Sequence, residues 1–174
     1  MSATVPGTSG PTGPVTLRPW PVAAARRLVE GVAPAPADAA GWHPDYPLPE
    51  TVDVLAMLLA AHAAMGTLAG LPRWWVHEIR VDGAVVGDVG FHGPPAAEGP
   101  AVVEIGYAVV PPLRRRGVAS RAVAQLLDVA WADGADQVLA GTDDDDVASQ
   151  GVLRRTGFRR RLAGDWAVRR PVAP

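Results

Sequence analysis

The spacing of apolar residues predicts helices in several parts of the chain. Segments 51–68 and 119–132 place apolar residues three and four positions apart, which gives a helix one buried face. Thr51 is a residue type that favours the cap position before a helix, and Gly134 is placed to end the second of these helices. Shorter helices are predicted over residues 22–32 and 147–156.

Short apolar runs between the helices predict β-strands, because turn residues bound them and several are rich in valine. The predicted strands cover residues 15–20, 74–81, 84–91, 102–110, 137–140, 158–162 and 165–170. Asp82-Gly83 separates two of them and is a strong signal for a hairpin. Because no repeat and no linker divides the pattern, we expect one α/β domain, of the α+β kind, over residues 15–174.

The composition is that of a folded protein, since 48% of the 174 residues are hydrophobic. Residues 1–14 differ: they are rich in Gly, Pro, Ser and Thr and lack the apolar centre of a signal peptide, so we expect a disordered tail and a cytoplasmic protein. The net charge of −2 gives no basic field for nucleic acid, and the apolar runs are too short to span a membrane. The absence of Cys excludes disulfides and a thiol nucleophile, and the absence of Lys excludes a Walker or Schiff-base lysine.

The most informative stretch is 103–121, in which an apolar strand, two prolines, three arginines and a glycine precede a helix. Backbone N–H groups of such a loop and of the helix N-terminus converge on one point, and arginines add positive charge there. An isolated arginine triplet is more often a solvated charge cluster. In this order the pattern predicts an anion cradle, with a pyrophosphate as the expected guest.

The order of the predicted elements and the pattern Arg114-x-x-Gly117-x-Ala119 resemble the GNAT superfamily of acyl-CoA-dependent N-acetyltransferases, whose phosphate loop follows Q/R-x-x-G-x-G/A. Thr142-Asp-Asp-Asp-Asp-Val-Ala-Ser149, with Gly151-Val-Leu and Thr156-Gly-Phe158 after it, is similar to a segment of the branch that includes the ribosomal-protein alanine acetyltransferases. The resemblance implies a mixed, mostly antiparallel sheet of six to seven strands, splayed at the fourth and flanked by about four helices. It also implies acetyl-CoA as co-substrate.

The resemblance implies that the donor is bound mainly by backbone groups. The implied cofactor-binding residues are Tyr107, Ala108, Val109, Arg114, Arg115, Arg116, Gly117, Val118, Ala119, Ser120, Asp146 and Ser149. By family position, the N–H groups of 115–120 bind the pyrophosphate of CoA and the N–H of Val109 polarises the thioester carbonyl. Gly117 permits a close approach, because it has no Cβ.

Glu104 is the first candidate for the general base. A carboxylate in an apolar strand is costly unless it is paired or functional. The resemblance places this glutamate on the acceptor side, often acting through a water; the alternative is an edge-facing or salt-bridged glutamate, for example one paired with an arginine. Asp88 is a second carboxylate in an apolar strand and a weaker candidate.

Ser149 is the candidate for the acid that protonates the leaving thiolate, or for a contact to the arm of CoA. Many relatives carry a tyrosine for the first role four residues before the Gly-Phe pair, where this chain has Leu153. The alternative for Ser149 is a helix cap. Asp146 stands where relatives usually carry asparagine, and a carboxylate accepts hydrogen bonds but cannot donate them.

Trp42, Tyr46, Asp88 and Glu104 are the predicted acceptor-binding residues. Aromatic rings beside an acid can bind a cationic amine; the alternative is a loop that buries Trp42 and Tyr46 in the core. The acidic run 143–146 lacks the glycine and the spacing of a calcium loop, so we expect a solvated loop that caps the next helix. The four histidines show no metal spacing, although His77 and His92 are expected in paired strands. We predict no metal site.

These features predict an enzyme that transfers an acetyl group from acetyl-CoA to a primary amine of a small molecule or a peptide N-terminus, by direct attack in a ternary complex. The alternative is a GNAT-fold module that binds CoA as a sensor or assembly partner, which the missing tyrosine and Asp146 favour. A nucleotide-binding α/β protein is disfavoured by the absent Walker lysine. A homodimer is an option that the family suggests, whereas the identity of the amine does not follow from the sequence.

Overall fold

The computed structural model describes residues 13–33, 35, 39–68 and 73–171. Most of the tail predicted over residues 1–14 therefore lies outside the described residues. In chain order the elements are β1 (Val15–Pro19), α1 (Val22–Val29), α3 (Pro49–Ala64), β2 (Val76–Val81), β3 (Ala84–Phe91), β4 (Val102–Val109), the 3-10 helix η1 (Pro111–Leu113), α4 (Val118–Ala132), β5 (Gln137–Ala140), α5 (Val147–Arg155), β6 (Arg159–Arg160) and β7 (Trp166–Arg169).

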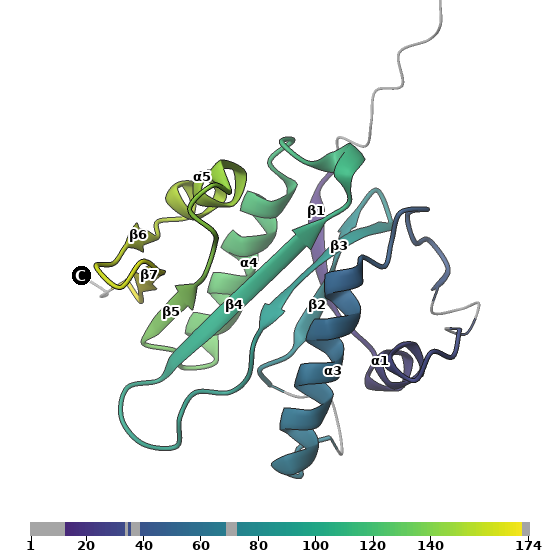
Figure 1. Ribbon diagram of the computed structural model, residues 1–174, viewed down its shortest axis with the longest axis horizontal. Helices are drawn as coiled ribbons and strands as arrows, with labels where there is room; N and C mark the ends of the chain where they lie inside the picture. Colours follow the sequence, from purple (N-terminus) through teal and green to yellow (C-terminus); the bar gives the residue numbers. More distant parts are fainter. Residues whose placement is uncertain (1–12, 34, 36–38, 69–72, 172–174) are drawn as a thin grey trace, which may run out of the picture.

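One seven-stranded sheet runs through the described residues, in the order β1-β2-β3-β4-β5-β7-β6. Only the β4–β5 pair within it is parallel, so the prediction of a mixed and mostly antiparallel sheet is confirmed. Helices α1 and α3 cover one face, and α4 covers the other with α5 beside it (Figure 1). Within the described residues, the four α-helices named above agree with the expected number. None of these helices is both long and apolar enough to cross a bilayer.

Strands β4 and β5 separate halfway along β4. Their pairing ends at Ile105 and Ala140, whereas β4 stays paired with β3 as far as Val109 opposite Gly87. Residues 106–109 therefore keep a neighbour on one side only. The splay that was predicted at the fourth strand is confirmed. One edge of β4, over residues 106–109, therefore has no hydrogen-bonded strand beside it on the β5 side.

The hydrogen bonds between β3 and β4 show which backbone groups of β4 face the side from which β5 has separated. The N–H of Val110 donates to β3, and the carbonyl of Glu104 accepts from the N–H of His92. In an antiparallel pair, successive residues direct their N–H and C=O groups to opposite sides. The backbone groups of Tyr107 and Val109 therefore point away from β3, toward the side that β5 has left.

The buried stripe predicted on the helix after the arginines lies in the core. Val123, Leu126, Leu127 and Ala130 of α4 are buried, and Trp20, Trp75 and Phe91 are among the largest fully buried side chains. The Asp82-Gly83 hairpin is also confirmed, with positive φ at both residues, 50° and 81°.

The prediction that Thr51 caps a helix is wrong. Helix α3 begins two residues earlier, at Pro49, with Leu48 at the cap position and no side-chain cap. Pro49 suits a first helical position because its fixed φ is helical and its missing N–H is not needed there. Thr51 lies in the first turn, and its hydroxyl donates to Asp88 instead. The helix also ends at Ala64, four residues before the predicted end.

Candidate active site

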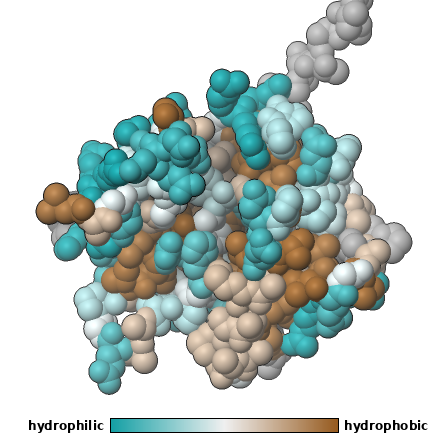
Figure 2. All heavy atoms as spheres, viewed as in Figure 1, coloured by the Kyte–Doolittle hydropathy of each residue, from teal (hydrophilic) through white to brown (hydrophobic). Residues whose placement is uncertain are grey.

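A cavity of about 490 Å³ lies where β4 and β5 separate. Its lining includes His92, Glu104, Tyr107, Asp143, Asp146 and Ser149. Hydrophilic residues gather over α5 and the loops beside it on the face shown in Figure 2. The cavity thus joins the predicted base, the predicted acid and the acidic loop, which lie up to 45 residues apart in the sequence.

Asp146, rather than Ser149, caps α5. The carboxylate of Asp146 accepts a hydrogen bond of 2.9 Å from the backbone N–H of Ser149. Bonds from the hydroxyl and the N–H of Ser149 hold the pKa of the Asp146 carboxyl below its usual range. The capping predicted for the acidic loop is confirmed, and the cap assignment for Ser149 is wrong. The Ser149 side chain remains at the cavity.

Tyr107 joins the opened strand to α5. Its hydroxyl donates to the backbone carbonyl of Ser149 across 3.1 Å. Burial raises the pKa of Tyr107 to about 12, so its hydroxyl stays protonated and remains a donor at neutral pH. Only a backbone contact was predicted for Tyr107. The signal for its side chain was its position on the same strand as Glu104, but the pairing with Ser149 needs the fold.

The loop after β4 has the conformation of an anion cradle. Gly117 has φ 74°, in the left-handed region where glycine is favoured, and α4 begins after it without a side-chain cap. The first-turn N–H groups of α4 are therefore available to an anion. Arg114 lies against the strand end, where its Nε–H donates to the carbonyl of Val109 at 2.8 Å.

Other predicted donor residues surround this loop. Arg115 and Arg116 are exposed, whereas Val118 is buried and Ala119 is half-buried. Within the part of the chain that the structure describes, the buried hydroxyl of Ser120 has no hydrogen-bond partner. A donor that lacks a partner beside an uncapped helix start is consistent with a group that meets an anion there.

Glu104 lines the cavity, is half exposed and has a histidine as its charged neighbour, so the alternative of an edge-facing or ion-paired glutamate also fits this position. Its Oε1 is 3.5 Å from Nδ1 of His92, and the two side chains are 49% and 35% exposed. In the sequence, His92 stood out only as one of four histidines without metal spacing, and its pairing with Glu104 was not predicted. A histidine next to the last residue of a strand gives no signal until the strand register is known.

Asp88 does not line this cavity. Its side chain is buried under α3 and accepts hydrogen bonds from the hydroxyls of Thr51 and, at 3.4 Å, of Tyr46. Burial raises the pKa of Asp88 to about 6, although the two hydroxyl bonds act in the other direction. The Nε1–H of Trp20 donates to the Tyr46 oxygen at 3.0 Å and extends the network.

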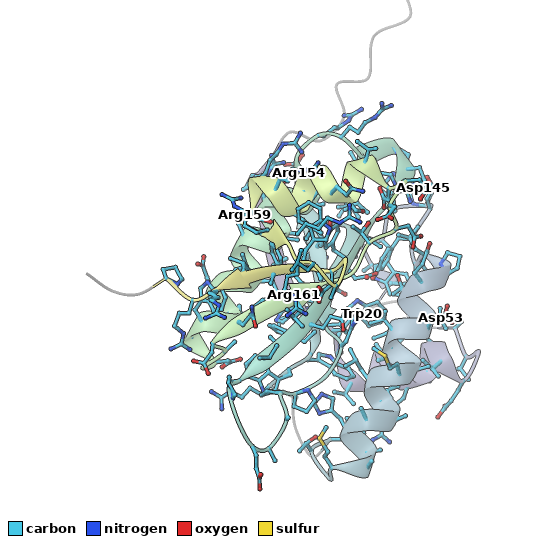
Figure 3. All side chains as sticks on the ribbon, turned by 60° about the vertical axis from the view of Figure 1, so that its left-hand side comes forward. Trp20, Asp53, Asp145, Arg154, Arg159 and Arg161 are labelled. Carbon is cyan, nitrogen blue, oxygen red and sulfur yellow. The ribbon has the colours of Figure 1, made fainter. Side chains whose placement is uncertain are left out.

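The aromatic residues of the segment before α3 pack around Trp20, which lies between the sheet and α3 (Figure 3). The ring of Trp42 lies 5.6 Å from Trp20 and 5.4 Å from Tyr46. Tyr46 is 5% exposed and belongs to the core, as the alternative held. The backbone beside Trp42 bonds to Val85 of β3, beyond the end of β4.

The histidines do not form a metal site among the described residues, where no group of three metal-binding side chains occurs. His77 lies in β2, which pairs with β3 as expected, and is opposite Val89; His92 lies one residue beyond the end of β3, outside the paired stretch. Since side chains of directly opposite residues share a face, His77 and His92 point to opposite faces of the sheet.

The profile of the Acetyltransferase (GNAT) domain family matches residues 15–159. The chain belongs to this family. The match covers most of the chain and includes the opened strand, the arginine loop and α5. The resemblance that the sequence motifs suggested is therefore confirmed at the level of the family. No significant match is found among curated protein sequences.

Solved GNAT structures share the fold at low sequence identity. Mycobacterium smegmatis RimJ in complex with CoA-disulfide is 23% identical, with a TM-score of 0.62 over 91% of this chain and 83% of that chain. The yncA acetyltransferase of Salmonella typhimurium with acetyl-CoA is 18% identical, with a TM-score of 0.56 over 89% and 93%. The ribosomal-protein-S5-alanine acetyltransferase of Vibrio fischeri is 16% identical, with a TM-score of 0.56 over 89% and 92%.

Proposed function

We propose that this protein transfers the acetyl group of acetyl-CoA to a primary amine of a small molecule or a peptide N-terminus, by direct attack in a ternary complex. The observation that carries the proposal is the opened edge of β4 beside the uncapped start of α4. The two similar structures that contain CoA-disulfide and acetyl-CoA support it.

Donor binding follows from the backbone of the opened strand and loop. The outward groups of Tyr107 and Val109 pair with the pantetheine arm as a missing strand would, and the N–H of Val109 polarises the thioester carbonyl. The N–H groups around Gly117, with Arg115 and Arg116, hold the pyrophosphate. Arg114 already bonds to the Val109 carbonyl, so we assign it to fixing the strand end.

Acetyl transfer also needs a proton removed from the amine and one given to the thiolate. Glu104, with His92 beside it, supplies the basic group at the mouth of the cavity. Leu153 stands at the position where many relatives carry the tyrosine that protonates the thiolate. It is fully buried and has no proton to donate. The hydroxyls of Tyr107 and Ser149, both at the cavity, take over that role.

The acceptor is a cationic amine. Glu104 and Asp143 line the cavity, and their carboxylates attract an ammonium group before it is deprotonated. Trp42, Tyr46 and Asp88 act mainly by holding the segment before α3 in position, since Tyr46 and Asp88 are buried among their own partners. A cytoplasmic location and a homodimer remain predictions.

The experiment combines binding and turnover. Acetyl-CoA at 100 times its Kd is expected to stabilise the native state by about 2.7 kcal/mol, which a thermal unfolding scan measures. A library of primary amines is then screened for release of the CoA thiol. Binding without release by any amine would favour the sensor alternative, and no thermal shift at millimolar acetyl-CoA would refute the proposal.

A further inference from the structure

Gly106 marks the place where the ring of His92 lies. A Cβ built on Gly106 would come within 2.7 Å of Nε2 of His92, closer than real contacts allow. Gly106 has no positive φ, so its backbone does not require a glycine. The missing side chain instead leaves room for the imidazole above β4, at the first residue after β5 separates from it.

Glu104 holds the other side of the same ring. Its Oε1 is 3.5 Å from Nδ1, and the backbones of the two residues are bonded through the His92 N–H and the Glu104 carbonyl at 2.8 Å. The Glu104 carboxylate also lies near the start of the next loop, 3.7 Å from a Cβ built on Gly141. Hydrogen bonds between catalytic groups are often long before substrate binds, so 3.5 Å is compatible with a working pair.

The other histidines are engaged elsewhere. His62 is buried, with its ring nitrogens 2.7 Å from the Thr67 hydroxyl and 3.1 Å from the Trp74 carbonyl. His77 is buried, and Nδ1 of His43 accepts from the backbone N–H of Asp45. Of the four, only His92 lines the cavity among the described residues.

We propose that His92 is the general base of the reaction and that Glu104 is a positioning residue which orients its ring. This inference rests on the proposed acetyl transfer. A neutral imidazole has one nitrogen that donates and one that accepts. A carboxylate beside Nδ1 favours the tautomer with the proton on that nitrogen, which leaves Nε2, above Gly106, free to accept a proton.

The proton and electron movements balance as follows. The ammonium group of the acceptor gives one proton to Nε2, and the freed lone pair forms the C–N bond with the thioester carbon, which moves the carbonyl electrons onto oxygen. When the carbonyl forms again, the C–S bond breaks and its electron pair goes to sulfur. The second proton of the nitrogen passes to the thiolate by way of the hydroxyls of Tyr107 and Ser149, and the imidazolium, with Glu104 as counter-ion, loses its proton to water.

The first test compares His92→Ala and His92→Gln with His43→Gln, which alters another histidine beside an acid, His43 with Asp45 at 3.8 Å. Each variant is assayed with the best acceptor found in the amine screen. Both His92 variants are expected to lower kcat by about 100-fold, as removal of a general base does. The Kd for acetyl-CoA stays within twofold, and His43→Gln leaves both values unchanged.

Two readouts separate a base from a structural residue. Added imidazole should restore turnover to His92→Ala in a saturable way, and the loss of kcat at acidic pH in the native enzyme should vanish in His92→Gln. Glu104, Tyr107, Asp143 and Asp146 line the same cavity, so this pH comparison is repeated in Glu104→Gln. The proposal would be overturned if imidazole did not restore kcat to His92→Ala while His92→Gln still lost kcat at acidic pH. A kcat within threefold of the native value in the His92 variants would also overturn it.

A second measurement does not depend on any acceptor. In the NMR spectrum of ¹⁵N-histidine-labelled protein, the neutral His92 ring is expected to carry its proton on Nδ1, and Glu104→Gln should weaken that preference. A neutral ring with the proton on Nε2 in the native protein would overturn the assignment of Glu104 and His92. The proposed acetyl transfer is tested separately from the role of His92. If it is wrong, the native protein shows no thermal shift with acetyl-CoA or no release of the CoA thiol.

Discussion

The donor side and the region under α3 are built in opposite ways. The donor side is one contiguous stretch, 103–121, and its proposed contacts come mostly from backbone groups of the opened strand and of the helix start. The region under α3 is a side-chain network, in which Trp20, Tyr46, Thr51 and Asp88 come from separate segments. A backbone site tolerates changes of side chain and depends on conformation, whereas a side-chain network depends on each member.

The largest expected effect is on the donor side, in Gly117→Trp. The indole fills the space that the pyrophosphate needs, so the Kd for acetyl-CoA should rise by about 100-fold or more, which is about 2.7 kcal/mol. Isothermal titration measures it. Gly134→Trp is the matched control, since this glycine lies after the other end of α4 with φ 96° and open space around it. Equal binding by both variants would show that the loop does not hold the donor.

Glu104→Gln tests the pair of Glu104 and His92 at the cavity. Loss of the carboxylate removes the partner of His92, so kcat should fall by about 100-fold while the Kd for acetyl-CoA is unchanged. Steady-state kinetics with the acceptor from the screen measure the effect. Glu98→Gln, in the exposed loop before β4, should behave as the native protein. A kcat that Glu104→Gln leaves intact would remove Glu104 from the mechanism.

Asp88→Asn tests the network under α3 through pH. The pKa of Asp88 is raised from 3.8 to about 6, so the native state binds this proton more tightly than the unfolded state does. This group therefore stabilises the native state fully below pH 3.8, and the contribution is lost as the pH rises through about 6. At about 1.4 kcal/mol per pKa unit, the loss is at most about 3 kcal/mol.

Urea unfolding of both proteins at pH 4 and pH 7 measures this difference. The native protein should lose more stability between the two values than Asp88→Asn does. Asp53→Asn is the control, because Asp53 lies on the exposed side of α3 (Figure 3). Parallel losses in Asp88→Asn and the native protein would contradict the raised pKa.

The smallest expected effect is in Asp146→Asn. Asparagine is also a good cap residue, so α5 keeps its cap, but the lowered pKa of the Asp146 carboxyl means that its charged form stabilises the native state. The free energy of unfolding at neutral pH should therefore fall slightly. The amide adds a donor toward the arm of CoA, and one hydrogen bond of about 1 kcal/mol would tighten acetyl-CoA binding about fivefold. Asp145→Asn, in the same loop, serves as the control in the same titration (Figure 3). Weaker binding by Asp146→Asn would mean that the native carboxylate already makes the better contact.

The fold could be predicted from the sequence where the signals are local. The Asp82-Gly83 hairpin, the buried stripe of α4 and the arginine loop each depend on residues close in the chain, and each has the predicted form. The start of α3 was missed because Pro49 and Thr51 both suit a helix start. In the structure the Thr51 hydroxyl donates to Asp88 of β3, so it does not cap the helix, and α3 begins at Pro49.

The sequence by itself predicted the family, the opened strand and the proposed donor loop, because a backbone-built site needs only a contiguous stretch with the right conformations. Tertiary structure decided which side chains meet. The strand register brings His92 to Glu104 and over Gly106, and the packing of α5 brings Ser149 to Tyr107. The physical reason is that side-chain chemistry depends on separations of a few ångströms between residues distant in the chain, and only strand register and helix packing set those separations.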